Sequence, residues 1–207
     1  PNGLAQEELI RSALSDAGLD ASDVCYVEAH GTGTKLGDPI EVEALTNVYG
    51  SGSGSASGSG SSRKCPLYVG SVKANLGHLE TAAGMAGLFS VIASLQRGKV
   101  PPNCHLNTLN RGMVVDSNIV FPVCTTEIGG VDRSHLVGGV SSFGYSGTIS
   151  HMLVEVPRVV FPYDFAGCHS ECELDGVSRV PPAASLPMAH YVQRRGKSPW
   201  TVQCYLH

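Results

Sequence analysis

Apolar residues near the start of the chain recur with the period of a helix. Residues 2–17 therefore predict an amphipathic helix, which Gly18 is well placed to end. The apolar face of this helix carries Ile10, Ala13, Leu14 and Ala17. Residues 24–29 and 67–72 are short, mostly apolar and rich in β-forming side chains, so we expect each of them to form a buried strand.

A second helix is predicted from its start signal. Asp38 stands as a capping residue, Pro39 at the first helical position and Glu41 as the glutamate of a capping box. We expect this helix to continue to Tyr49 and to end at Gly50.

Residues 79–96 are apolar nearly all round, which predicts a helix buried on every side. Gly84 and Gly87 would weaken this helix by up to about 1 kcal/mol each. We expect the close approach of a neighbouring element to compensate for that loss.

Residues 136–141 and 150–156 predict two more strands, joined by the glycine-rich loop 142–148. Strands and helices thus alternate along most of the chain. Such alternation is typical of a layered α/β core.

Two segments fall outside this pattern. Residues 51–62 are almost entirely glycine and serine, and we expect them to form a flexible loop. Residues 158–207 show no clear period and are repeatedly interrupted by proline, so we expect a poorly ordered tail without an assigned function. The folded unit is therefore predicted to span residues 1–157.

Composition limits the possible partners. The 207 residues carry a formal net charge of −4 and no basic run, so we expect no nucleic-acid binding and no polybasic membrane anchor. No apolar run reaches the roughly 18 residues of a membrane span, and the N-terminus lacks a signal-peptide pattern. These features indicate a soluble, cytoplasmic protein, with an organellar location left open.

The seven cysteines form an odd number without regular spacing, which favours reduced thiols in a cytosol-like compartment. Cys168 and Cys172 resemble half of a zinc site, but no second pair of ligands follows them. We therefore expect no metal site.

Two histidines stand in matching contexts. His30 and His78 each occur where an apolar, strand-like run gives way to a glycine-bearing turn. Two imidazoles held in this way can donate two hydrogen bonds to one oxygen atom. That arrangement can stabilise an enolate or another oxyanion.

The residues around both histidines resemble those of the β-ketoacyl synthase family, the condensing enzymes of type I polyketide and fatty-acid synthases. The matching blocks, in order, are E-A-H-G-T-G-T with L-G-D-P-I-E, G-S-V-K-A-N-L-G-H-L-E-T-A-A-G, P-P-N-C-H-L-N-T-L-N and G-G-V-S-S-F-G-Y-S-G-T-I-S-H. The resemblance covers the C-terminal half of the family's domain. It implies the C-terminal half of a thiolase-like fold with α/β/α layers, and exposed apolar surface where the other half would pack.

The resemblance also implies a reaction. Members of the family join an acyl thioester to a malonyl-type extender by decarboxylative Claisen condensation, and the extender rides on the phosphopantetheine arm of an acyl carrier protein. The resemblance implies no directly bound cofactor, and a ketosynthase homodimer for the complete domain. The family's nucleophilic cysteine lies upstream of the matched blocks, so this chain alone is expected to be inactive. A non-catalytic half-domain that serves as an interaction module is the alternative.

For the catalytic side chains, the resemblance assigns the two enolate-stabilising hydrogen bonds to His30 and His78. We expect His78 to precede a long helix, whose positive N-terminal end would keep the ring neutral. Lys73 and Glu80 would orient His78, and a structural ion pair between them is the alternative.

For the substrate, Thr32 and Thr34 match threonines that bind the amides of the phosphopantetheine arm, and simple turn formation is the alternative. Phe143 and Tyr145 match aromatic residues beside the acyl pocket. Tyr145 is expected to act as a gate or else to pack in the core. Ile149 departs from the family, which usually carries an asparagine there.

Overall fold

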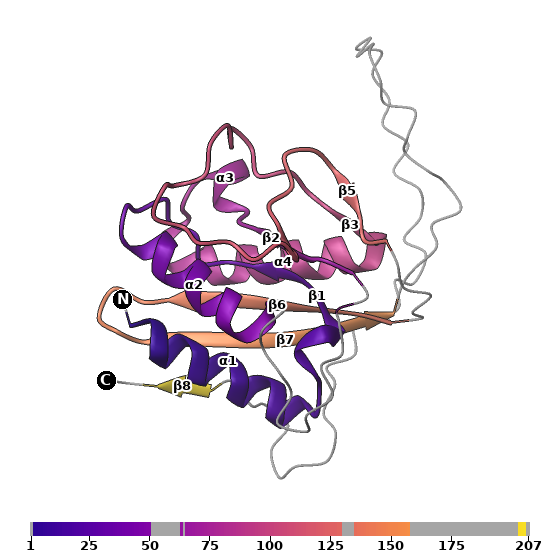
Figure 1. Ribbon diagram of the computed structural model, residues 1–207, viewed down its shortest axis with the longest axis horizontal. Coiled ribbons are helices and arrows are strands. Elements are labelled where there is room, and N and C mark those ends of the chain that lie inside the picture. The colour runs from indigo at the N-terminus through magenta and orange to yellow at the C-terminus, as the bar shows by residue number, and fades with distance from the viewer. Residues whose placement is uncertain (1, 51–62, 64, 130–134, 158–202, 206–207) are drawn as a thin grey trace.

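A six-stranded mixed sheet forms the centre of the structure (Figure 1). The computed structural model describes residues 2–50, 63, 65–129, 135–157 and 203–205. The strands, in spatial order, are β4 (Ile119–Val120), β2 (Leu67–Gly70), β1 (Val24–Glu28), β6 (His135–Phe143), β7 (Ile149–Pro157) and β8 (Gln203–Tyr205). The first four run parallel, whereas β7 is antiparallel to both β6 and β8. A separate antiparallel pair joins β3 (Lys99–Val100) to β5 (Thr126–Glu127).

Helices cover both faces of this sheet. On one face, α1 (Gly3–Ala17) and α2 (Gly37–Tyr49) pack together, and Ile10 and Leu45 share an apolar cluster with Val27 of β1. On the other face, α4 (Ala83–Arg97) contributes Val91 to a second cluster with Tyr26 of β1. All five residues of β1 are buried, as expected for a central strand. The predicted α/β/α layering is thus confirmed.

The first helix follows its sequence signals at both ends. The Asn2 side chain accepts a hydrogen bond from Ala5 N at 3.2 Å, and Gly18 ends the helix in the left-handed conformation. A short 3₁₀ helix, η1 (Ala21–Asp23), then leads into β1.

The capping box predicted for the second helix is wrong. Helix α2 begins at Gly37, after Leu36, and the Asp38 side chain does not cap it. Asp38 instead accepts hydrogen bonds from Gly33 N and Thr34 N, so it holds the preceding loop. A carboxylate can meet amide donors on either side of a helix start, and sequence spacing does not say which side it takes.

The helix predicted over residues 79–96 is present, but its first turn is the 3₁₀ turn η2 (Glu80–Ala82), which leads directly into α4. A separate one-turn helix, α3 (Lys73–Leu76), precedes it. Helix α4 is also not buried all round, because Met85 and Phe89 are 53% and 62% exposed. These two positions lie four residues apart on one face of the helix, which has no neighbour among the described residues.

Glycines let α4 lie close to the sheet, as the sequence predicted. A Cβ atom at Gly87 would lie 3.1 Å from both Glu28 Cγ and Val140 Cγ2. A Cβ atom at Gly84 would lie 2.9 Å from Ser142 Oγ. The close approach that we expected at these two positions is therefore confirmed.

Residues 51–62 and most of residues 158–207, including Cys168 and Cys172, lie outside the described residues. Within the tail, Gln203–Tyr205 is described and pairs with β7 as strand β8. In the ranges that the structure describes, no helix is long and apolar enough to cross a membrane. In the same ranges, no three His, Cys, Asp or Glu side chains gather as metal ligands.

Candidate active site

The two histidines singled out by the sequence lie side by side. Their ring centroids are 6.1 Å apart, and the ring planes are nearly perpendicular, at 89°. His30 follows β1, and His78 follows α3. Strand β1 pairs with β2, which leads to α3, so the parallel pairing brings the two residues to the same edge of the sheet.

His30 is half-buried and held by its neighbours. Its ring packs against Phe143 with centroids 5.0 Å apart, and Phe143 N donates a hydrogen bond to His30 Nδ1 at 3.3 Å. A ring nitrogen that accepts from an N–H carries no proton, so the neutral ring has its proton on Nε2. Burial, then the positive charge of Lys73 and the neighbouring His78, lower the pKa of His30 to about 4. His30 is therefore a neutral donor near pH 7.

His78 has the same tautomer for a similar reason. Glu80 N donates a hydrogen bond to His78 Nδ1 at 2.9 Å, which leaves Nε2 to carry the proton of the neutral ring. His78 precedes a long helix, as expected, but the 3₁₀ turn η2 separates it from the start of α4 at Ala83. A backbone amide, and not a helix end, therefore sets the orientation and the tautomer of this ring.

The loop after His30 is held by two carboxylates from α2. Glu41 is 5% exposed and accepts hydrogen bonds from His30 N at 2.7 Å and Gly31 N at 2.9 Å. Burial raises the pKa of Glu41 to about 7, although both backbone hydrogen bonds act in the opposite direction. Burial also raises the pKa of Asp38, which binds the next two amides of the loop. Hydrogen bonds to two side chains of α2 therefore fix the backbone that carries His30.

The two threonines of this loop, Thr32 and Thr34, differ in the hydrogen bonds of their hydroxyl groups. Thr34 Oγ1 accepts a hydrogen bond from Gly37 N at 3.0 Å, so Thr34 takes part in the turn before α2. No hydrogen bond to the Thr32 hydroxyl is found within the described part of the chain. Thr32 is therefore free to bind a ligand, while Thr34 also serves the turn.

The ion pair between Lys73 and Glu80, one of the two expected roles of these residues, is not found among the described residues. The charge of Lys73 instead lies near Glu28 and Glu41, both of which raise its pKa, although burial lowers that pKa overall. Glu80 acts through its backbone N–H, as described above for His78.

Glu28 is a buried charged residue that the sequence reasoning did not single out. It is 1% exposed, accepts a hydrogen bond from Tyr26 Oη at 2.6 Å, and also accepts one from Val72 N. Burial raises its pKa. Because Val72 precedes Lys73, Glu28 ties β1 to the segment that carries Lys73 and His78. The sequence signal that could have identified Glu28 is its position in the E-A-H motif, two residues before His30.

The two aromatic residues at the end of β6 and in the β6–β7 connection take different positions. Phe143 packs on His30, whereas Tyr145 is fully exposed at 108%. Core packing of Tyr145, one of the two expected possibilities, is therefore wrong. Gly144 N donates to Thr148 O at 2.7 Å, so a backbone hydrogen bond closes this connection next to Ile149.

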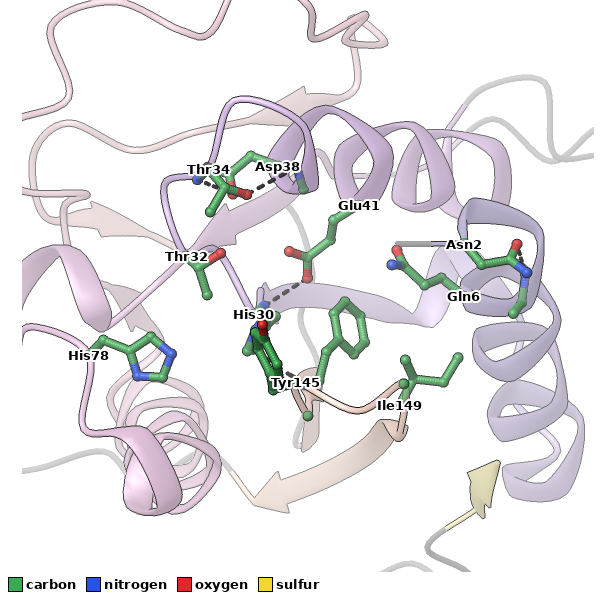
Figure 2. A pocket seen from close by; sticks show the side chains of 15 residues that line it. Asn2, Gln6, His30, Thr32, Thr34, Asp38, Glu41, His78, Tyr145 and Ile149 are labelled. Atoms are coloured by element: carbon green, nitrogen blue, oxygen red, sulfur yellow. Dashed lines mark hydrogen bonds between the residues drawn. The ribbon is translucent and has the colours of Figure 1, made fainter. Parts of the chain in front are cut away.

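These side chains border a cavity of about 830 Å³ (Figure 2). Its lining includes His30, His78, Thr32, Tyr145, Gln6 and Ile149. A second cavity of about 390 Å³ shares Thr32, Asp38, Glu41 and His78 with the first and also borders Lys73 and Cys104. The structure thus brings all the predicted site residues except Glu80 to one cavity system.

Two imidazole N–H donors that border one cavity can stabilise negative charge that develops on a carbonyl oxygen. The layered fold and this pair of histidines agree with the family model described as the C-terminal domain of β-ketoacyl synthase, which matches residues 1–107. The chain belongs to the β-ketoacyl synthase family.

Within that family, the chain is a ketosynthase C-terminal domain of the polyketide synthase type. It is 43% identical over 170 residues to a subunit of the phenolphthiocerol/phthiocerol polyketide synthase of Mycobacterium tuberculosis, covering 78% of this chain and 8% of that protein. It is 43% identical over 155 residues to erythronolide synthase EryA3 of Saccharopolyspora erythraea, covering 75% of this chain and 5% of that protein.

A solved structure supports the same assignment. The ketosynthase from module 6 of the bacillaene synthase of Bacillus subtilis is 34% identical and superposes with a TM-score of 0.65. The match covers 75% of this chain and 27% of that chain. The chain thus spans less than a third of this solved ketosynthase and less than a tenth of the two synthases named above.

Proposed function

We propose that this chain supplies the enolate-stabilising part of a ketosynthase that performs decarboxylative Claisen condensation. The observation that supports this best is the pair of adjacent imidazoles, both with Nδ1 occupied by a backbone N–H. Each ring is then left with an Nε2 donor for the thioester oxygen of a malonyl-type extender.

In the proposed step, the bond between the extender's α-carbon and its carboxylate breaks and carbon dioxide leaves. The bonding electrons move into the thioester and place negative charge on its oxygen, where His30 and His78 donate. The resulting enolate attacks the acyl thioester, and the thiolate of the nucleophilic cysteine departs. We propose that this cysteine belongs to a part of the ketosynthase outside this chain.

The proposed carrier of the extender is the phosphopantetheine arm of an acyl carrier protein. Thr32 borders both cavities and has a free hydroxyl, which makes it the better candidate of the two threonines for an amide of the arm. Thr34 would then contribute less, because its hydroxyl oxygen already accepts from Gly37 N. We propose no directly bound cofactor and a homodimeric complete domain.

The test uses a chimaera in which residues 2–157 replace the matching part of a polyketide synthase ketosynthase of measured activity. His30→Ala and His78→Ala are each expected to slow carbon dioxide release by about 10²–10³-fold, the usual effect of losing one oxyanion donor. Acyl loading of the cysteine should change far less, because a thiolate depends on its own surroundings. His135→Ala, at the start of β6 and outside both cavities, is the control. Equal losses in loading and decarboxylation would contradict the assigned roles.

A second candidate function is a non-catalytic interaction module. It is favoured by exposed apolar side chains on and around α3 and α4, which are Leu76, Leu79, Met85 and Phe89. The same chimaera separates the two candidates. A chimaera that folds and loads an acyl group but never releases carbon dioxide would favour the interaction module.

A further inference from the structure

A buried amide in the large cavity has an unsatisfied oxygen. Gln6, on α1, is 3% exposed, and its Oε1 has no hydrogen-bond partner within the described part of the chain. A buried acceptor without a partner is costly and rare, so it calls for a physical reason. Gln6 lies one helical turn after the N-cap Asn2, and both residues line the cavity that contains His30.

No described residue forms a hydrogen bond with Gln6 Oε1. Figure 2 shows its side chain reaching from α1 toward Glu41, and Ile149 lines the same cavity. Both carboxylate oxygens of Glu41 already accept backbone N–H groups, and Ile149 and Ala5 have apolar side chains. In the same view Gln6 lies on the opposite side of His30 from Thr32 and His78.

These positions restrict the chemistry of a ligand group at Gln6. A carboxamide presents an acceptor and a donor side by side, and a hydroxyl can pair with either of them. A charged group would lose its hydration in this largely apolar region, and an anion would also meet Glu41. The amides of the carrier arm belong with Thr32 and Thr34, on the other side of His30. A neutral hydroxyl on the acyl chain fits best.

We propose that Gln6 is a specificity residue that binds a hydroxyl group of the acyl substrate. This inference rests on the proposed function, because it assumes that the extender's thioester lies at His30 and His78 and that the acyl chain enters the same cavity. It adds that the site takes hydroxylated acyl chains in preference to unsubstituted ones.

The test measures binding of three probes to the full chain: the pantetheine thioesters of hexanoate, 3-hydroxyhexanoate and 5-hydroxyhexanoate. One hydroxylated probe is expected to bind about fivefold more tightly than the hexanoyl probe, the usual worth of one net hydrogen bond. Gln6→Met removes hydrogen bonding at similar length and should abolish this preference. It should also raise the melting temperature of the free chain by about 2–4 °C, because the unsatisfied group is gone. Gln96→Met, the same change on α4 outside the cavities, should do neither.

Each other outcome overturns the proposal in a recognisable way. If all three probes bind equally to the wild-type chain, and nuclear magnetic resonance shifts report them at His30 and Thr32, the hydroxyl subsite is wrong and the proposed function stands. If Gln6→Met weakens all three probes equally, the contact belongs to the amides of the arm. If no probe perturbs His30 or Thr32, both the subsite and the proposed function fail. The wild-type comparison holds even if Gln6→Met does not fold.

Discussion

Buried ionisable residues have opposite effects on how stability depends on pH. Burial lowers the pKa of His151, as of His30, to about 4. Between pH 6.5 and 4 the unfolded state therefore takes up protons that the folded state does not, and stability falls as pH falls through this window. Glu41, with a pKa raised to about 7, acts the other way, because the folded state binds its proton first.

His151 allows this effect to be isolated. It is 1% exposed, with Ser141 Oγ 2.9 Å from Nδ1 and Tyr49 Oη 3.2 Å from Nε2. His151→Gln keeps hydrogen-bonding groups but cannot titrate. Between pH 7 and pH 5 the free energy of unfolding should fall in both proteins. The fall should be smaller in the variant than in the wild type, by up to about 2 kcal/mol. Urea unfolding at the two pH values is the measurement. Parallel pH profiles for variant and wild type would show that His151 titrates normally.

A substitution at Glu41 tests how much its hydrogen bonds to the His30 loop stabilise the fold. Glu41→Gln replaces one carboxylate oxygen with an amide NH2 group, which would face a backbone N–H. One of the two hydrogen bonds to the loop is therefore lost. We expect a loss of about 1–3 kcal/mol in the free energy of unfolding. Glu43→Gln, at an exposed position of the same helix, should change it by less than about 0.5 kcal/mol. If the two substitutions cost the same, Glu41 is not the support that we infer.

At the scale of elements, the sequence predicted most of the framework. Helix α1 and strands β1, β2, β6 and β7 appear where periodicity and turn residues placed them, to within a few residues. The 3₁₀ turn at the start of the helix predicted over residues 79–96 was missed, because hydrophobicity alone does not distinguish a 3₁₀ turn from the first turn of an α-helix.

Side-chain partners were harder to predict than elements. Asp38 and Glu41 match a capping box by spacing, yet both bind the loop before α2, because that loop folds back over the helix start. The buried partners of Glu28 come from β1 and from the start of α3, 44 residues further along. Contacts between such distant residues depend on the tertiary fold, which local patterns do not contain.

The contact between α4 and the sheet can be tested at Gly87. Gly87→Ala places a methyl group 3.1 Å from Glu28 Cγ and Val140 Cγ2. The crowding should cost about 1–3 kcal/mol, partly offset by about 1 kcal/mol of better helix propensity. We expect a net loss in unfolding free energy by chemical denaturation. Gly129→Ala, where a Cβ meets nothing within 4 Å, is the control. A stabilised Gly87→Ala protein would contradict the close packing.

At the scale of the whole molecule, the exposed face of α4 stands out. Met85 and Phe89 are more than half exposed, although α4 packs its Val91 and Leu95 into an apolar cluster with the sheet. We expect Met85→Gln with Phe89→Gln to change stability by less than about 0.5 kcal/mol but to reduce self-association of the chain. Sedimentation velocity measures this change. Leu4→Gln with Val114→Gln, at two other exposed apolar positions, is the control pair. Equal effects of the two pairs would mean that the α4 face is no special contact surface.

The central claim is that His30 and His78 donate together to one thioester oxygen. Infrared difference spectroscopy tests it most directly, with a pantetheine thioester that carries ¹³C at its carbonyl, bound to the full chain. Two donors should lower the carbonyl stretching frequency below its value in water, and His30→Ala and His78→Ala should each remove part of that shift. A carbonyl frequency that stays at its value in water, or that neither substitution changes, would contradict the account.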